Sequence, residues 1–120
     1  MKKIFVVDDN ISNLLVTEEV LSKQFDVYTL SSAAFMFNLL NKIIPDLIIL
    51  DLLMPEMNGF DVLKLLKNDR KYADIPVIIL TSKGDTATET HGLEIGAVDF
   101  IRKPFSKPVL LDRITKFIHE

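Results

Sequence analysis

The sequence predicts an α/β fold in which helices cover both faces of a parallel β-sheet. Short apolar runs alternate with stretches of helical length and pattern along the chain. Two of these runs, Leu47–Leu50 and Val77–Leu80, are apolar throughout, which is typical of strands that are buried on both faces. Strands that alternate with helices connect by right-handed crossovers, and this arrangement gives a parallel sheet between two layers of helices.

Five strand–helix units follow one another along the chain. We expect strands at roughly residues 3–7, 26–30, 46–50, 76–80 and 98–101. We expect helices at roughly residues 11–23, 32–43, 58–68, 85–95 and 107–118. In the last of these helices, Leu110, Ile114 and Phe117 have the spacing of one helix face, and we expect that face to be buried.

Capping and turn residues separate these elements. Ser31–Ser32 can cap the second helix and Ser106 can cap the fifth. Pro45 and Pro76 stand just before the third and fourth strands, where a proline removes no hydrogen bond from the sheet. Asn58–Gly59 is a turn pair that leads into the third helix.

Composition and charge limit the classes of function. A chain of 120 residues with 48% hydrophobic and 26% charged residues suits one globular domain, residues 1–120. A net charge of −3 does not favour direct nucleic-acid binding by this domain, and the absence of cysteine excludes disulfides and thiolate chemistry. The first apolar run is too short for a signal peptide or a membrane span, so we expect a cytoplasmic location and no contact with a membrane.

Reactive side chains follow four of the five predicted strands. They are Asp8 and Asp9 after the first strand, Asp51 after the third, Thr81 and Ser82 after the fourth, and Lys103 after the fifth. Ligands of open parallel sheets bind at this edge. If the first and third strands are neighbours, three carboxylates meet there and repel one another unless a cation sits among them.

The chemistry of this set is coherent. Carboxylates are ligands that suit Mg²⁺, and a carboxylate can also attack phosphorus to form an aspartyl phosphate. A metal, a hydroxyl and an ammonium can then hold the phosphoryl oxygens and spread the charge of the transition state.

Five motifs, in order along the whole chain, resemble those of the CheY-like response regulator receiver domains of two-component signalling. They are Val7–Asn10, Leu50–Phe60, Ile79–Ser82, Gly96–Phe100 and Lys103–Phe105. The resemblance implies a five-stranded parallel sheet in the order 2-1-3-4-5, within a doubly wound, flavodoxin-like three-layer sandwich. It also implies a phosphoacceptor domain that assists its own phosphorylation and dephosphorylation and is not a turnover enzyme.

The resemblance assigns roles to the acids. Asp51 is the phosphoacceptor and takes its phosphoryl group from a sensor histidine kinase or a histidine phosphotransfer protein. Asp9 and Asp51 bind Mg²⁺ directly, together with the backbone carbonyl of Leu53, and Asp8 supports the metal through water.

The resemblance also implies a switch. Thr81 and Lys103 contact the phosphoryl group, and the Lys103–Pro104 peptide bond is expected to be cis. Phe100 is expected to change rotamer as Thr81 moves. The change then biases the surface formed by the fourth helix, the fifth strand and the fifth helix, which binds an output partner or a fused domain.

Two variable features of the family bear on this chain. We expect the Leu53 side chain to face the site and, with Lys83, to set the lifetime of the phosphoryl group. Asp99 and Arg113 match an ion pair through which some receivers form weak homodimers, but Val109 stands where those members usually carry an acid.

Other interpretations remain beside this one. An aspartate-nucleophile phosphatase would need a second acid at the position of Leu53, and no nucleotide-binding glycine motif is present. A receiver fold that docks partners without phosphorylation is a further alternative. In isolation, Asp8, Asp9 and Asn10 are also typical helix-capping residues, and Lys103 is an ordinary surface lysine.

Overall fold

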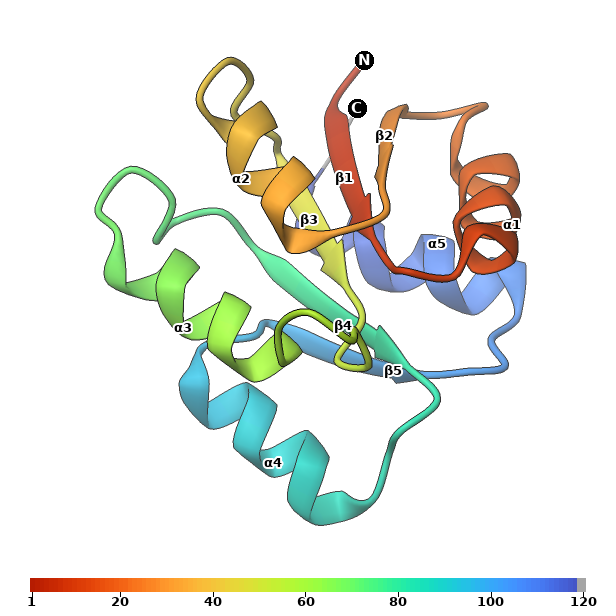
Figure 1. Cartoon of the computed structure of the whole chain (residues 1–120). Coiled ribbons are helices and arrows are strands. Elements are labelled where there is room, and N and C mark those ends of the chain that lie inside the picture. Colours follow the sequence, from red (N-terminus) through yellow and green to blue (C-terminus); the bar gives the residue numbers. More distant parts are fainter. Residues whose placement is uncertain (119–120) are drawn as a thin grey trace.

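The structure is a computed structural model that describes residues 1–118 (Figure 1). Five β-strands alternate with five α-helices in this part of the chain. In chain order, they are β1 (Lys3–Val7), α1 (Ile11–Leu21), β2 (Asp26–Leu30), α2 (Ala33–Leu40), β3 (Leu47–Leu50), α3 (Gly59–Asn68), β4 (Val77–Thr81), α4 (Thr86–Ile95), β5 (Asp99–Arg102) and α5 (Lys107–Thr115).

The strands form one parallel sheet in the order β2-β1-β3-β4-β5, which confirms the predicted fold class and topology. The chain first adds β2 on one side of β1 and then adds the other three strands on the opposite side. Since β1 and β3 are therefore neighbours, their carboxyl ends lie together at the point where the winding reverses.

Each strand supplies side chains to two separate cores. On β1, Phe5 and Val7 belong to the core shared with α2 and α3, whereas Ile4 and Val6 belong to the core shared with α1 and α5. Figure 1 shows α1 and α5 on one face of the sheet and α2, α3 and α4 on the other. The continuous apolar runs of β3 and β4 are buried in full, as expected for strands covered on both faces.

Polar side chains begin each helix. The residues before α1 to α5 each accept a hydrogen bond from a backbone N–H of the first turn, which would otherwise lack a partner. In order, these caps are Asn10, Ser32, Asn58, Asp85 and Ser106. The predicted caps of the second and fifth helices are thus confirmed.

The prediction of a buried face on the last helix is wrong at one residue. Leu110 and Ile114 are fully buried, but Phe117 is 36% exposed and Ile118 is buried instead. The helix α5 ends at Thr115, and the N–H of Phe117 bonds to the carbonyl of Ile114 in a tighter turn. Ile118 lies four residues after Ile114, and its N–H bonds to the Ile114 carbonyl, so Ile118 continues the buried face in place of Phe117.

No helix within residues 1–118 is long and apolar enough to cross a membrane.

A lysine secures the connection between α3 and β4. The ammonium of Lys67 donates hydrogen bonds to the carbonyl oxygens of Ala73 at 3.1 Å and Ile75 at 2.8 Å. Burial lowers the pKa of Lys67, and the charge of Asp74 opposes this shift. The side chain therefore satisfies two backbone acceptors of a loop that lies outside the sheet.

Replacing Lys67→Met is expected to lower the free energy of unfolding by about 1–3 kcal/mol, because the apolar stem is kept while two partly buried carbonyls lose their donor. Urea denaturation measures the change. Lys64→Met, the same substitution at an exposed position of α3, is the matched control and should have little effect. Equal stability of the two variants would contradict the role assigned to Lys67.

Candidate functional site

Two buried carboxylates lie side by side at the carboxyl edge of the sheet. Asp8 follows β1 and Asp51 follows β3, and the preceding residues Val7 and Leu50 are register partners. The N–H of Asp51 bonds to the carbonyl of Val7 at 3.0 Å, so the ladder between the two strands holds the acids together. Each residue is only 5% exposed.

Lys103 joins the two acids. Its ammonium lies 2.6 Å from Oδ2 of Asp8 and 3.1 Å from Oδ2 of Asp51. The backbone N–H of Lys103 bonds to the carbonyl of Thr81, which places the lysine directly beyond the β4–β5 pair. The Lys103–Pro104 peptide bond is cis, as the resemblance implied.

Backbone amides complete the environment of both carboxylates. The N–H of Asn10 donates to Oδ1 of Asp8 at 3.0 Å, and the N–H of Leu53 donates to Oδ1 of Asp51 at 2.9 Å. Sequence reasoning did not find these donors, because nearly every residue type carries the same backbone amide. The only signal available was that short loops follow both strands.

The electrostatic balance of the cluster is negative. Burial raises the pKa of the Asp8 carboxyl; hydrogen bonds from Lys103 and Asn10 oppose this shift, and the nearby charge of Asp51 adds to it. One ammonium faces two carboxylates, so the three ionised groups together carry one uncompensated negative charge. Buried charge of this kind calls for a further positive partner.

The third predicted acid does not share this burial. Asp9 is exposed, and no three His, Cys, Asp or Glu side chains among residues 1–118 lie together in a way that could hold a metal ion. The structure thus brings together two of the three carboxylates that the sequence placed at this edge. Asp9 as a direct metal ligand stays a prediction.

Thr81 and Phe100 lie on the adjacent strands β4 and β5, and β4 is the neighbour of β3, the strand that Asp51 follows. Thr81 is the last residue of β4 and is fully buried, and its Oγ1 accepts a hydrogen bond from the N–H of Lys83 at 3.3 Å. Phe100 is on β5 and is 5% exposed, so its ring is packed inside the protein in this state. Its change of rotamer stays a prediction.

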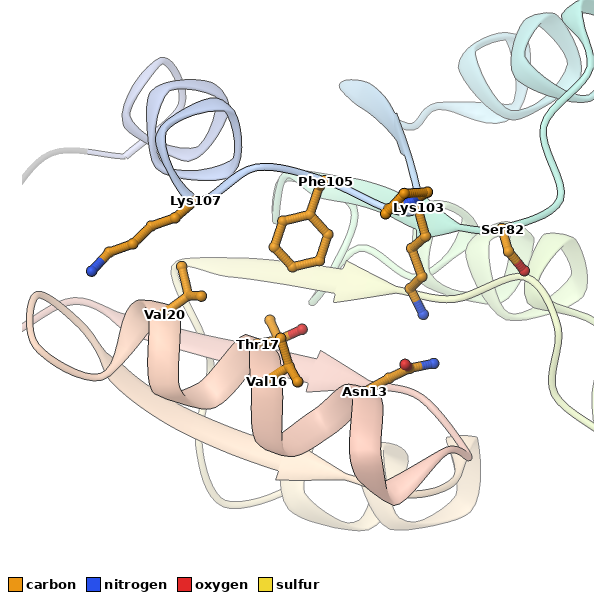
Figure 2. Close-up of a pocket in the computed structure, with 9 residues that line it drawn as sticks. Asn13, Val16, Thr17, Val20, Ser82, Lys103, Phe105 and Lys107 are labelled. Atoms are coloured by element: carbon orange, nitrogen blue, oxygen red, sulfur yellow. The ribbon is translucent and has the colours of Figure 1, made fainter.

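A groove runs from the site between α1 and the β5–α5 connection (Figure 2). Its volume is about 490 Å³. Figure 2 shows the ring of Phe105 above α1, with Val16, Thr17 and Val20 facing it and Lys103 at the end nearest the acids. The other lining residues are Asn13, Ser82, Pro104 and Lys107.

The predicted interface ion pair forms within one chain. The guanidinium of Arg113 donates to Oδ1 of Asp99 at 2.8 Å, which ties α5 to the start of β5. Homodimerisation through this face stays a prediction.

Comparison with known proteins identifies the family. The family model for the response regulator receiver domain matches residues 4–115, and the chain belongs to this family. A probable transcriptional regulator of Guillardia theta, ycf27, is 39% identical over 114 residues, which are 94% of this chain and 44% of that protein. The chain spans about half or less of the length of the first curated relatives it matches.

Solved structures agree. The chemotaxis protein CheY4 of Vibrio cholerae has a TM-score of 0.91 at 28% identity, with 98% of this chain and 99% of that chain covered. The BeF3-activated receiver domain of DrrB, a Thermotoga maritima protein, has a TM-score of 0.88 at 31% identity, with 98% and 97% covered. The protein is thus a receiver domain of a response regulator, a class of signalling domain that interacts with histidine kinases and output domains and generally binds Mg²⁺.

The residues present fit a magnesium ion. Mg²⁺ is bound through one or two carboxylates and keeps water in its other positions. Asp51 offers a buried carboxylate to such an ion, and the buried carboxylate of Asp8 beside it can accept hydrogen bonds from water on the metal. Each of their oxygens has one protein donor in the structure and a lone pair left to accept a second partner.

The raised pKa of Asp8 makes the free energy of unfolding depend on pH. Because burial raises its pKa above the ordinary value of 3.8, the folded protein holds the Asp8 proton more tightly than the unfolded chain does. The free energy of unfolding therefore falls as the pH rises through the raised pKa.

Asp8→Asn is accordingly expected to stabilise the metal-free protein at pH 7, with the gain shrinking as the pH falls toward 3.8. Urea denaturation with a chelator present, over a pH series, measures the difference between the variant and the parent. Asp112→Asn changes an exposed acid of α5 and is the control. A stabilisation by Asp8→Asn that is independent of pH would refute the assignment.

Proposed function

We propose that this receiver domain accepts a phosphoryl group on Asp51 from a phosphohistidine of a sensor histidine kinase or a histidine phosphotransfer protein. The observation that carries the proposal is the position of Asp51, buried at the sheet edge with Lys103 3.1 Å from one carboxylate oxygen. The solved structure of the DrrB receiver domain supports it, because that domain is activated by BeF3, which resembles a phosphoryl group in shape and charge.

The transfer is a displacement at phosphorus. A carboxylate oxygen of Asp51 forms the new P–O bond while the P–N bond to the donor imidazole breaks, and the imidazole leaves with the bonding electrons and takes up a proton. Mg²⁺ would be held by Asp9, Asp51 and the backbone carbonyl of Leu53, with Asp8 behind water, and would neutralise charge on the phosphoryl oxygens.

The side chains around Asp51 have separate tasks in this proposal. Lys103, already beside the Asp51 oxygen, supplies a positive charge to a phosphoryl oxygen, and the hydroxyl of Thr81 supplies a hydrogen bond. The phosphoryl group brings roughly 1.5 to 2 negative charges in place of the single charge of the Asp51 carboxylate, beside an ammonium that is already shared with Asp8. We therefore expect the ammonium of Lys103 to move from Asp8 toward the phosphoryl group.

The groove beside Lys103 is the approach we propose for the donor. Its walls are largely apolar, and two neighbouring α1 residues outside its lining, Ile11 and Leu15, are each 59% exposed. A donor protein that covers this side would exclude water from the acids and place its phosphohistidine over Asp51.

The side chain of Leu53 distinguishes this site from the active site of a turnover phosphatase. A turnover phosphatase needs a group near the nucleophile that can activate water or protonate the leaving group, and the Leu53 side chain can do neither. It is 46% exposed at the rim of the site, next to the amide that binds Asp51. We infer that Leu53 prolongs the life of the phosphoryl group.

Incubation with acetyl phosphate and Mg²⁺ is expected to add about 80 Da to the protein, the mass of one phosphoryl group. The adduct should be lost in Asp51→Ala and kept in Asp61→Asn, which changes an exposed acid of α3. A chelator should greatly reduce the yield. An adduct that survives Asp51→Ala, or no adduct at all, would refute the proposal.

Leu53→Asn is expected to speed the loss of the phosphoryl group severalfold, because an amide can orient an attacking water that leucine cannot. The rate is followed by mass spectrometry after the phosphodonor is removed. Leu65→Asn makes the same change at an exposed position on α3 and should leave the rate unaltered. Identical rates in Leu53→Asn and the parent would eliminate Leu53 as a determinant of lifetime.

A further inference from the structure

The helix α4 is held in place with almost no buried side chain of its own. Among Thr86–Ile95, the one buried residue is Gly92. Three of the four glycines of the chain accompany this helix: Gly84 before it, Gly92 within it and Gly96 after it. Figure 1 shows α4 against α3 and β5 at the edge of the molecule. The contacts that position α4 therefore come largely from side chains of other elements, together with Ile95, which packs against the core, and His91, whose ring meets that of Phe60 edge-on.

Three side chains converge on Gly92. A Cβ atom at this position would lie 2.7 Å from Cδ1 of Ile79, 3.5 Å from Cε1 of Phe60 and 3.7 Å from Cδ2 of Phe100. The first distance is shorter than real Cβ contacts allow, so an alanine here must displace either Ile79 or the helix. Glycine is also less favourable than alanine in a helix interior, so helix propensity does not explain its presence.

The contact at Gly92 leads back to the site through the sheet. Ile79 is two residues before Thr81 on β4 and is the register partner of both Leu50, which precedes Asp51, and Phe100. The two side chains from the sheet that meet Gly92 thus stand on strands whose ends carry the proposed phosphoryl ligands. A movement of Phe100 would therefore reach α4 at Gly92.

The glycines that flank α4 meet side chains of a different kind. A Cβ at Gly84 would lie 2.7 Å from Nε of Arg102, and one at Gly96 would lie 3.0 Å from Cγ of Lys67. Gly84 thus meets a long arginine side chain, whereas Lys67 beside Gly96 is held by its hydrogen bonds to the α3–β4 connection. Ile79 differs from Arg102 because it is fully buried, so packing in the core restricts the position of its Cδ1 atom.

We propose that Gly92 is the positioning residue through which the phosphorylation site acts on α4, with the end of Ile79 and the edge of Phe100 as the surfaces that set the position of the helix. The effect of phosphorylation on this contact rests on the proposed function, whereas the contact itself exists in the unmodified protein. Addition of one methyl group at Gly92 shifts α4 without touching Asp51, Thr81 or Lys103.

The experiment compares Gly92→Ala with the double variant Gly92→Ala/Ile79→Val, which removes the Cδ1 atom that the new methyl group meets. Methyl NMR of the isoleucine δ1 groups and amide hydrogen exchange report on the unphosphorylated protein. We expect Gly92→Ala to speed exchange within α4 by about tenfold, as for other overpacked sites, and to shift the Ile79 methyl signal. The double variant should return α4 exchange most of the way to the parent value.

Thr90→Ala is the control, because it raises helix propensity at an exposed position of α4 and leaves the sheet contact unaltered. It should leave α4 exchange equal to or slower than that of the parent. The proposal is overturned if Gly92→Ala leaves α4 exchange at the parent rate, or if Ile79→Val fails to reverse its effect.

The link to phosphorylation is tested with beryllium fluoride and Mg²⁺ on the same proteins. In the parent, binding should shift the amide signals of α4. The single variant Ile79→Val removes the contact without adding an atom, and it replaces Gly92→Ala if that variant does not fold. In Ile79→Val, the shifts of the α4 signals should be smaller than in the parent, while the signals around Asp51 should change fully. Undiminished α4 shifts would overturn the coupling. Absence of any change around Asp51 would instead contradict the proposed function and leave the contact to be judged by hydrogen exchange.

Discussion

The organisation of this protein depends on one ammonium shared by two buried carboxylates. Lys103 lies 2.6 Å from Asp8 and 3.1 Å from Asp51, and neither acid has enough solvent to carry its charge alone. Three strands, β1, β3 and β5, must end at the same edge for these groups to meet, and their parallel orientation achieves this. The order β2-β1-β3-β4-β5 makes β1 and β3 neighbours. The arrangement leaves one negative charge uncompensated. That excess favours a cation, and it makes the position of Lys103 sensitive to any new charge on Asp51.

Most of this arrangement could be predicted from the pattern of apolar and acidic residues in the sequence. Apolar runs without alternation predicted strands covered on both faces, and the acids directly after Val7 and Leu50 marked the edge where those strands end. The caps at Ser32 and Ser106 could be predicted because a serine just before a helix commonly accepts a hydrogen bond from a backbone N–H of the first turn. The motifs around Asp51 and Lys103 then led to the receiver family, which the match over residues 4–115 confirms.

Other features were beyond the sequence for physical reasons. Neither the backbone donors at Asn10 and Leu53 nor the exposure of Asp9 is encoded in residue type, because both depend on the path of a short loop. Phe117 was misplaced because helical spacing was extended past the end of α5. The contact at Gly92 could not be predicted either, since a glycine within a helix has no side chain whose pattern could reveal a partner.

In the proposed function, Asp51 carries a phosphoryl group that is held by residues from three separate strands. A crystal structure of the protein with Mg²⁺ and beryllium fluoride tests this most directly. We expect beryllium on a carboxylate oxygen of Asp51, with the ammonium of Lys103 moved from Asp8 to a fluorine and the hydroxyl of Thr81 bonded to another. Beryllium bound elsewhere, or a Lys103 that keeps its bond to Asp8 beside an occupied Asp51, would contradict it.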